Sequence, residues 1–197
     1  MNDDQEIKNN FNVHDHLKDK TVEELREINM EYRLPYSVCA WNIDGNLNIG
    51  MMIRTACNLG AERFIVIGRK HYDKRSCVGS NHYLPIDVVK AYDCDTENYD
   101  VSLFWHLMNQ YKYTPFLLET EGTSIVSRSY NIRNVIKKDV NPCLVFGSES
   151  QGLPQELFED KRCKRYTIPQ LGVIRSYNVS AAASIAMWEL VRDMVNV

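Results

Sequence analysis

The chain has 197 residues, a formal net charge of −3 and 44% hydrophobic residues. These values fit one globular domain with a sizeable core, and they exclude a chain that is basic throughout, so any RNA contact must come from a local patch. No apolar run approaches the roughly 20 residues of a membrane span, and the N-terminus lacks the pattern of a signal peptide.

In chain order, residues 1–20 are polar and aperiodic, and we expect a loose arm there. Thr21 to Glu24 form a capping-box pattern that opens a short helix, which Pro35 should end. Short apolar strands then alternate with helical patterns, which predicts an α/β fold with a mostly parallel sheet and helices on both faces. We expect strands at 37–41, 63–68, 86–89, 115–118, 144–146 and 165–168. We expect helices at 48–58, 101–111, from 154 to about 158 and at 178–194, and a long polar loop at 69–85.

Several familiar signatures are missing. No GxGxxG or GxxxxGK[ST] pattern occurs, so the common dinucleotide-binding and P-loop interpretations are unsupported. The six cysteines are scattered without a CxxC pair, which favours buried free thiols in a reducing cytoplasm over a disulfide framework or a metal site.

The first motif runs from Asn48 to Ala56, NIGMMIRTA. Asn48 suits a helix N-cap, and Gly50 suits a close backbone approach. Arg54 follows Asn48 by six residues, so it does not stack on Asn48 by simple helical spacing. On its own, this motif also fits an ordinary capped helix with a solvated arginine.

The second motif is LVFGSESQGLP, at 144–154. An apolar strand ends in a turn of glycines and polar residues that contains Glu149, and a helix begins after Pro154. In open α/β sheets, ligands bind in the crevice beyond the carboxyl ends of the strands, where this turn is expected. A surface turn with a solvated glutamate is the alternative.

The third motif is IPQLGVIRSYNVSAAASIAMW, at 168–188. A strand end leads through a loop into a helix that begins near Asn178. Ser176 and Asn178 place short polar side chains at the helix start, where backbone N–H groups are free to bind a ligand. A plain loop and an N-capped helix would give the same pattern.

Together, in this order, the three motifs resemble the SpoU-type (TrmH-like) branch of the SPOUT trefoil-knot RNA 2′-O-ribose methyltransferases. The resemblance covers about Ser37 to Val197, and it implies a C-terminal trefoil knot, which general folding rules would not suggest. We therefore expect an arm and short helix at 1–35 and a SPOUT methyltransferase domain at 36–197.

The resemblance also assigns residues. It implies catalytic roles for Arg54, Asn48, Glu149, Ser176 and Asn178. It implies that S-adenosyl-L-methionine is held, largely by backbone, at Gly147, Ile168, Ser176, Tyr177 and Asn178. Two positions depart from the family pattern: Tyr177 stands where Leu is common, and Gln170 where Met is frequent. We also expect no separate RNA-binding domain before the catalytic one.

The implied reaction is methyl transfer to a ribose 2′-hydroxyl, with tRNA preferred over ribosomal RNA as the substrate and no metal required. Arg54 would orient the hydroxyl and stabilise its negative charge, because a guanidinium is a poor free base. A knotted RNA-binding protein without catalysis is the alternative from another class, and base methylation belongs to other knotted branches.

Two partner surfaces are expected. An RNA patch should lie in the long loop, where basic groups can hold phosphates and aromatic rings can stack on bases. Its residues are Arg69, Lys70, His71, Lys74, Arg75 and His82, with Tyr72 and Tyr83 among them. A homodimer should form through the last helix, which is apolar nearly all round and carries small residues, and the family is typically dimeric through this region.

Overall fold

The computed structural model describes residues 12–68, 71–90, 92–93, 98–128, 131–136 and 140–195. Arg69 and Lys70 of the expected RNA patch, and Cys94, one of the six cysteines, lie outside these ranges. The first half of the chain contains η1 (Asp15–Leu17), α1 (Val22–Glu31), β1 (Leu34–Trp41), α2 (Asn46–Asn58), β2 (Ala61–Ile67), α3 (Lys74–Cys77), η2 (Ser80–His82), β3 (Ile86–Val89), β4 (Tyr92–Asp93) and β5 (Asn98–Tyr99). The second half contains α4 (Val101–Tyr111), β6 (Thr114–Ser124), η3 (Ile132–Asn134), β7 (Pro142–Phe146), α5 (Gln155–Glu159), β8 (Lys164–Thr167) and α6 (Val179–Val191).

The predicted α/β class is confirmed by a six-stranded sheet in the order β3-β2-β1-β7-β6-β8, in which every neighbouring pair is parallel. β1 lies at the centre, where Val38 pairs with Phe64 of β2 and Leu144 of β7. The short strands β4 and β5 form a separate antiparallel pair. The trefoil knot that the resemblance implies remains a prediction.

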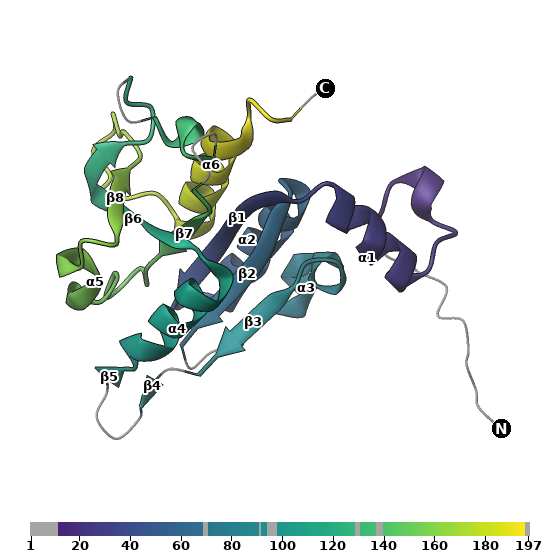
Figure 1. Cartoon of the computed structure of the whole chain (residues 1–197), viewed down its shortest axis with the longest axis horizontal. Helices are drawn as coiled ribbons and strands as arrows, with labels where there is room; N and C mark the ends of the chain where they lie inside the picture. The colour runs from purple at the N-terminus through teal and green to yellow at the C-terminus, as the bar shows by residue number, and fades with distance from the viewer. Residues whose placement is uncertain are drawn as a thin grey trace.

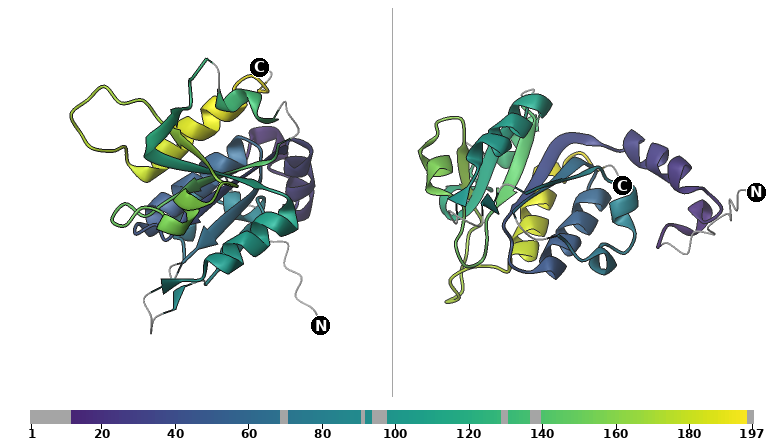
Figure 2. Two further views of the ribbon diagram at one scale, coloured as in Figure 1. Left: turned by 60° about the vertical axis from the view of Figure 1, so that its left-hand side comes forward. Right: turned by 90° about the horizontal axis from the view of Figure 1, so that it is seen from below.

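Helices cover both faces of the sheet because the central strands are apolar on both sides. In β1, Val38 and Ala40 belong to one buried cluster and Cys39 and Trp41 to the other. α2 and α6 pack on the first face, and α4 and α5 on the second (Figure 1; Figure 2). The site is thus built on the ends of strands that are rigidly held from both sides.

The helix at the N-terminal end forms as predicted. Thr21 and Glu24 make the reciprocal hydrogen bonds of a capping box, and Leu25 of α1 is buried. α1 is tied to η2 because Arg26 donates to the carbonyl oxygen of His82, and Arg33 to that of Tyr83. The helix ends at Glu31, so Pro35 lies inside β1 rather than ending the helix.

Three expectations were wrong, two about irregular segments and one about the end of a helix. The described part of the arm contains η1, because residues 15–17 form a turn of 3-10 helix. The loop at 69–85 contains α3 and η2, which are short turns fixed by local caps such as Asp73, a residue that accepts from the backbone N–H of Arg75. α6 ends at Val191 instead of Met194.

Gly50 makes the close approach that the sequence suggested. A Cβ at this position would lie 1.8 Å from Ser76 Oγ and 2.7 Å from the carbonyl oxygen of Asp73. Real Cβ atoms do not approach backbone so closely, so glycine lets α2 pack directly against α3. Gly60, which follows α2, has a φ of 72°, as a C-terminal helix cap requires.

The five described cysteines are free thiols, and four of them are buried: Cys39, Cys57, Cys77 and Cys143. Among the described helices, none is both long and apolar enough to cross a bilayer.

Candidate active site

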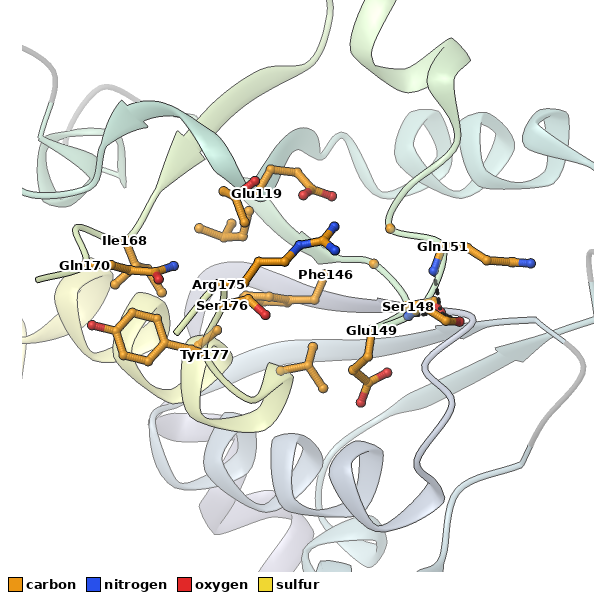
Figure 3. Close-up of a pocket in the computed structure, with 17 residues that line it drawn as sticks. Glu119, Phe146, Ser148, Glu149, Gln151, Ile168, Gln170, Arg175, Ser176 and Tyr177 are labelled. Carbon is orange, nitrogen blue, oxygen red and sulfur yellow. Dashed lines mark hydrogen bonds between the residues drawn. The ribbon is translucent and has the colours of Figure 1, made fainter. Parts of the chain in front are cut away.

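A cavity of about 420 Å³ opens beyond the carboxyl ends of β7 and β8 and beside the middle of β6. Its walls come from three segments, as Figure 3 shows: residues 118–120 of β6, the turn after β7 and the loop that leads from β8 to α6. The volume is that of a small-molecule site. Phe146, Ile168 and Val179 supply apolar surface, and Glu119, Glu149 and Arg175 supply charge.

The turn after β7 is closed by its own backbone. Ser148 and Gly152 exchange two backbone hydrogen bonds, of 3.2 and 2.8 Å. Gly152 has a φ of 70°, and a Cβ on Gly147 would lie 2.4 Å from the Gly152 backbone. Glycine is therefore required at 147 by contact and favoured at 152 by its dihedral angle. The turn therefore has a fixed shape, and its residues line the cavity.

Asn48 joins the three motifs. Its side-chain amide nitrogen donates to Glu149 Oε1 at 2.6 Å, and its amide oxygen accepts from the side-chain nitrogen of Asn178 at 3.2 Å. The expected N-cap role of Asn48 was wrong: Gly45 is the N-cap of α2, and Asn48 is the third residue of the helix. Instead, its side chain links the motifs, because Glu149 and Asn178 lie within hydrogen-bonding distance of it in the folded chain.

Asn178 is the N-cap of α6. Its side-chain oxygen accepts from the backbone N–H of Ser180 at 3.0 Å and of Ala181 at 3.3 Å. These bonds satisfy two of the free N–H groups at the helix start. They also orient the amide so that its nitrogen faces Asn48. The helix start and the Glu149 turn are thus held in one hydrogen-bonded chain.

Asp44 also holds the turn, and sequence reasoning missed it. Its backbone N–H donates to Glu149 Oε2 at 3.1 Å, and its carboxylate accepts from the hydroxyls of Ser148 and Ser150, at 3.1 and 2.7 Å. A signal was present, because Asp44 follows the C-terminal end of β1 as Glu149 follows that of β7. Polar residues at those ends meet along one edge of a parallel sheet.

The loop between β8 and α6 supplies a further wall. Ser176 and Tyr177 line the cavity, and the Tyr177 hydroxyl donates to the carbonyl oxygen of Pro169 at 3.2 Å across the loop. Arg175, which the sequence analysis did not single out, also lines the cavity. Figure 3 shows its side chain directed to the side where Glu119 lies.

The remaining assigned residues are placed as follows. Gly147, Ile168 and Glu149 line the cavity. Asn48 and Asn178 are not among the 17 residues that line it. They fix lining residues by hydrogen bonds, as Asn48 does with Glu149. Arg54 is exposed on α2 and is also outside this set. The chain therefore brings four of the five expected catalytic residues together, and Arg54 lies outside this group.

Only some of the described residues of the expected RNA patch are exposed, and one of the exposed cations is already in an ion pair. Lys74, Arg75, His71 and His82 are exposed, but Arg75 forms a 2.7 Å ion pair with Asp73. Tyr83 is 9% exposed and Tyr72 packs against the core, so the expected stacking role of Tyr83 was wrong. The Tyr83 ring is buried in the hydrophobic core beside α1, so it is not exposed for stacking on a base. Among the described residues, no cluster of three or more His, Cys, Asp or Glu side chains could hold a metal ion.

The sheet, the cavity at its carboxyl edge and the three joined motifs define an α/β domain built to hold a small ligand. The family model described as SpoU rRNA Methylase family matches residues 35–188, so the chain belongs to the SpoU rRNA methylase family.

Among curated proteins, the chain is similar to tRNA (guanosine(18)-2′-O)-methyltransferase of Borreliella burgdorferi. The two are 32% identical over 117 residues, which cover 53% of this chain and 52% of the relative. The match thus spans about half the length of that relative.

The chain is also similar in fold to solved structures, among them the following two. The AdoMet-bound rRNA methyltransferase of Sinorhizobium meliloti matches with a TM-score of 0.62 and 23% identity, over 87% of this chain and 61% of that chain. The TrmH/SpoU tRNA modifying enzyme of A. aeolicus matches with a TM-score of 0.66 and 21% identity, over 87% and 81%.

Proposed function

We propose that this protein is an RNA methyltransferase that uses S-adenosyl-L-methionine to methylate a ribose 2′-hydroxyl, with tRNA as its substrate. The observation that carries the proposal is the hydrogen-bonded chain from Glu149 through Asn48 to Asn178, which joins the three family motifs at one cavity. Family membership and the curated tRNA 2′-O-methyltransferase relative support the same reaction.

The cavity fits an adenosine-containing cofactor. Its volume of about 420 Å³ is within the range of small-molecule sites, and Phe146, Ile168 and Val179 offer an apolar wall for a purine. Gly147 leaves no room for a Cβ because the Gly152 backbone lies against it, and this contact keeps the turn compact beside the cavity. The residues that would hold the cofactor are Gly147, Ile168, Ser176 and Tyr177, with Asn178 behind them.

Bound S-adenosyl-L-methionine would supply an activated methyl group, so the reaction needs no metal ion and the protein's task is alignment and charge stabilisation. Arg54 orients the ribose hydroxyl and stabilises the negative charge that develops on its oxygen. Asn48 and Asp44 hold Glu149 in position, and Ser176 faces the cavity from the loop before α6.

A homodimer would complete this arrangement. On α2, Leu47 and Met51 are 61% and 51% exposed and share one helix face with Arg54. On the neighbouring α6, Ile185 and Trp188 are 38% and 48% exposed. The two helices pack together, with 3.3 Å between the hydroxyls of Thr55 and Ser184. A partner on this surface would bury the exposed apolar side chains and remove Arg54 from bulk water. In the lower dielectric of the interface, the charge of Arg54 would act more strongly.

Lys74 and Arg75 offer cations to the RNA backbone, together with Arg69 and Lys70 of the same segment. Ribosomal RNA is the second candidate substrate, because the family description and the S. meliloti relative both name rRNA. We place the protein in the cytoplasm, where its buried free thiols stay reduced.

The test is nucleoside mass spectrometry of tRNA and rRNA after incubation with the protein and methyl-labelled cofactor. We expect a labelled 2′-O-methylnucleoside in tRNA. Label confined to rRNA would replace the tRNA assignment. Cofactor binding without label in either RNA would identify a binding protein without catalysis, and a labelled base would place the chemistry in another class. Arg54→Ala serves as the inactive control.

A further inference from the structure

Glu119 occupies a position in the cavity that the proposed mechanism does not use. It follows Leu118 inside β6, at the irregular stretch between Leu118 and Thr123, and Leu118 makes the last pairing of β6 with β7, opposite Phe146. Glu119 therefore stands beside Gly147, at the carboxyl end of β7 and at the point where β6 stops pairing with β7. Its side chain lines the cavity and is half-buried (Figure 3).

The surroundings of this carboxylate leave acceptor capacity free. Backbone N–H groups of Thr120 and Leu153 donate to it, and Oε1 lies 3.7 Å from where a Cβ on Gly152 would be. A carboxylate has about four lone-pair sites, so two backbone donors occupy half of them. Within the described part of the chain, no side chain forms an ion pair with Glu119. A half-buried carboxylate with free lone pairs is suited to a ligand's donors.

We infer that Glu119 binds the ribose of the cofactor, by accepting hydrogen bonds from its 2′- and 3′-hydroxyls; this inference rests on the proposed function. Carboxylates at the carboxyl edge of parallel sheets bind ribose hydroxyls in nucleotide-binding folds. The ammonium of the cofactor's amino-acid end is the competing donor. Arg175 disfavours it, because this cation is directed to the same side of the cavity and would repel a second cation. Neutral hydroxyls can donate to Glu119 and accept from Arg175 together.

The experiment is isothermal titration of the full chain with S-adenosylhomocysteine and with 5′-methylthioadenosine, which keeps the ribose but lacks the amino-acid end. Glu119→Gln keeps the shape of the side chain and removes its charge. We expect this variant to bind both ligands about tenfold more weakly, because hydrogen bonds to a charged group are the stronger class. Glu121→Gln is the matched control, since Glu121 is exposed in the same strand and does not line the cavity.

Deoxy analogues complete the test. Removing the 2′- or 3′-hydroxyl should weaken binding to the wild-type protein by about the same tenfold factor. The same removal should change the affinity of the Glu119→Gln variant little, because both changes delete one contact. Additive losses would overturn the inference.

Two other results would also overturn it. Unchanged affinity of Glu119→Gln for S-adenosylhomocysteine would remove Glu119 from the site and leave the proposed function standing. A loss seen with S-adenosylhomocysteine but not with 5′-methylthioadenosine would assign Glu119 to the ammonium instead. A wild-type protein that binds neither ligand overturns the proposed function itself, so the two failures are distinguishable.

Discussion

The side-chain amide of Asn48 donates a hydrogen bond of 2.6 Å to the carboxylate of Glu149, although 101 residues separate the two in the chain. Asp44 holds the other oxygen of the same carboxylate through its backbone N–H. Glu149 is thereby fixed by two donors from one loop and helix start, and its geometry depends on the β1–α2 connection rather than on its own turn.

Asn48→Asp should replace this donor with a second carboxylate. We expect kcat at pH 8 to fall roughly 10- to 100-fold, the worth of a hydrogen bond to a charged group. Activity should partly recover as the pH falls, because one proton shared between the two carboxylates restores a hydrogen bond. Asn48→Ala should lose activity without this recovery. Parallel pH profiles for wild type and Asn48→Asp would count against the role of this contact.

Arg54→Ala should lower the rate of methyl transfer by about 10²-fold or more, since one charge-stabilising contact in the transition state is lost. Cofactor affinity should be unchanged, because Arg54 does not line the cavity. Single-turnover rates and isothermal titration measure the two quantities separately. Arg128→Ala, at another exposed arginine, is the control. Near-normal turnover of Arg54→Ala would remove the arginine from the mechanism.

Trp188→Glu should convert a dimer into a monomer by placing a charge in an apolar interface. Trp188 is 48% exposed on α6, beside Ile185, and burying a charge there without a partner is costly. Light scattering over a range of protein concentrations checks the mass. Tyr32→Glu changes an aromatic side chain that is 72% exposed at the end of α1, and it should leave the dimer intact. A wild-type mass that stays monomeric at every concentration would disprove the dimer.

Glu119→Gln should stabilise the free protein at neutral pH. Burial raises the pKa of the Glu119 carboxyl above its ordinary value of 4.5, although the Thr120 and Leu153 backbone donors oppose the shift. The folded chain then holds this proton more tightly than the unfolded chain, so stability is lost as the pH rises through the window just above 4.5. The variant removes that loss.

Thermal melts from pH 4 to 8 measure the difference. The melting temperature of Glu119→Gln should exceed that of wild type at pH 7, and the gap should close toward pH 4, where the wild-type carboxyl is protonated in both states. Glu121→Gln provides the matched comparison. A gap that widens on acidification would contradict the sign of the argument.

Charge reversal at Lys70, Lys74 and Arg75 should weaken RNA binding and lower its salt dependence. Each lost phosphate contact should reduce the log–log slope by about 0.7. Lys74→Glu alone should have a larger effect than Arg75→Glu, because Asp73 already pairs with Arg75. Filter binding over a salt series gives the slopes, and Lys112→Glu, exposed after α4, is the control. An unchanged slope would show that the RNA is held elsewhere.

The local elements could be predicted from the sequence because their causes lie within a few residues. The capping box at Thr21 and Glu24, the helix over 101–111, the cap at Asn178 and the glycine after α2 all appear as the patterns indicate. Apolar runs placed the strands of the parallel sheet, and three ordered motifs indicated the family. Each of these signals is a spacing along the chain, which a single sequence displays directly.

The tertiary structure alone decided which partner each polar side chain takes. Asn48 bonds to Glu149 and Asn178 instead of capping its own helix. Asp44 joins the site from the loop after β1 and Glu119 from the middle of β6, and Tyr83 is buried beside α1. These outcomes depend on the strand order β3-β2-β1-β7-β6-β8, which brings the ends of β1 and β7 together with the middle of β6. Hydrophobic periodicity specifies which face of an element is buried. It carries no information on which distant segment will cover that face, so contacts across a hundred residues become visible only when the sheet is assembled.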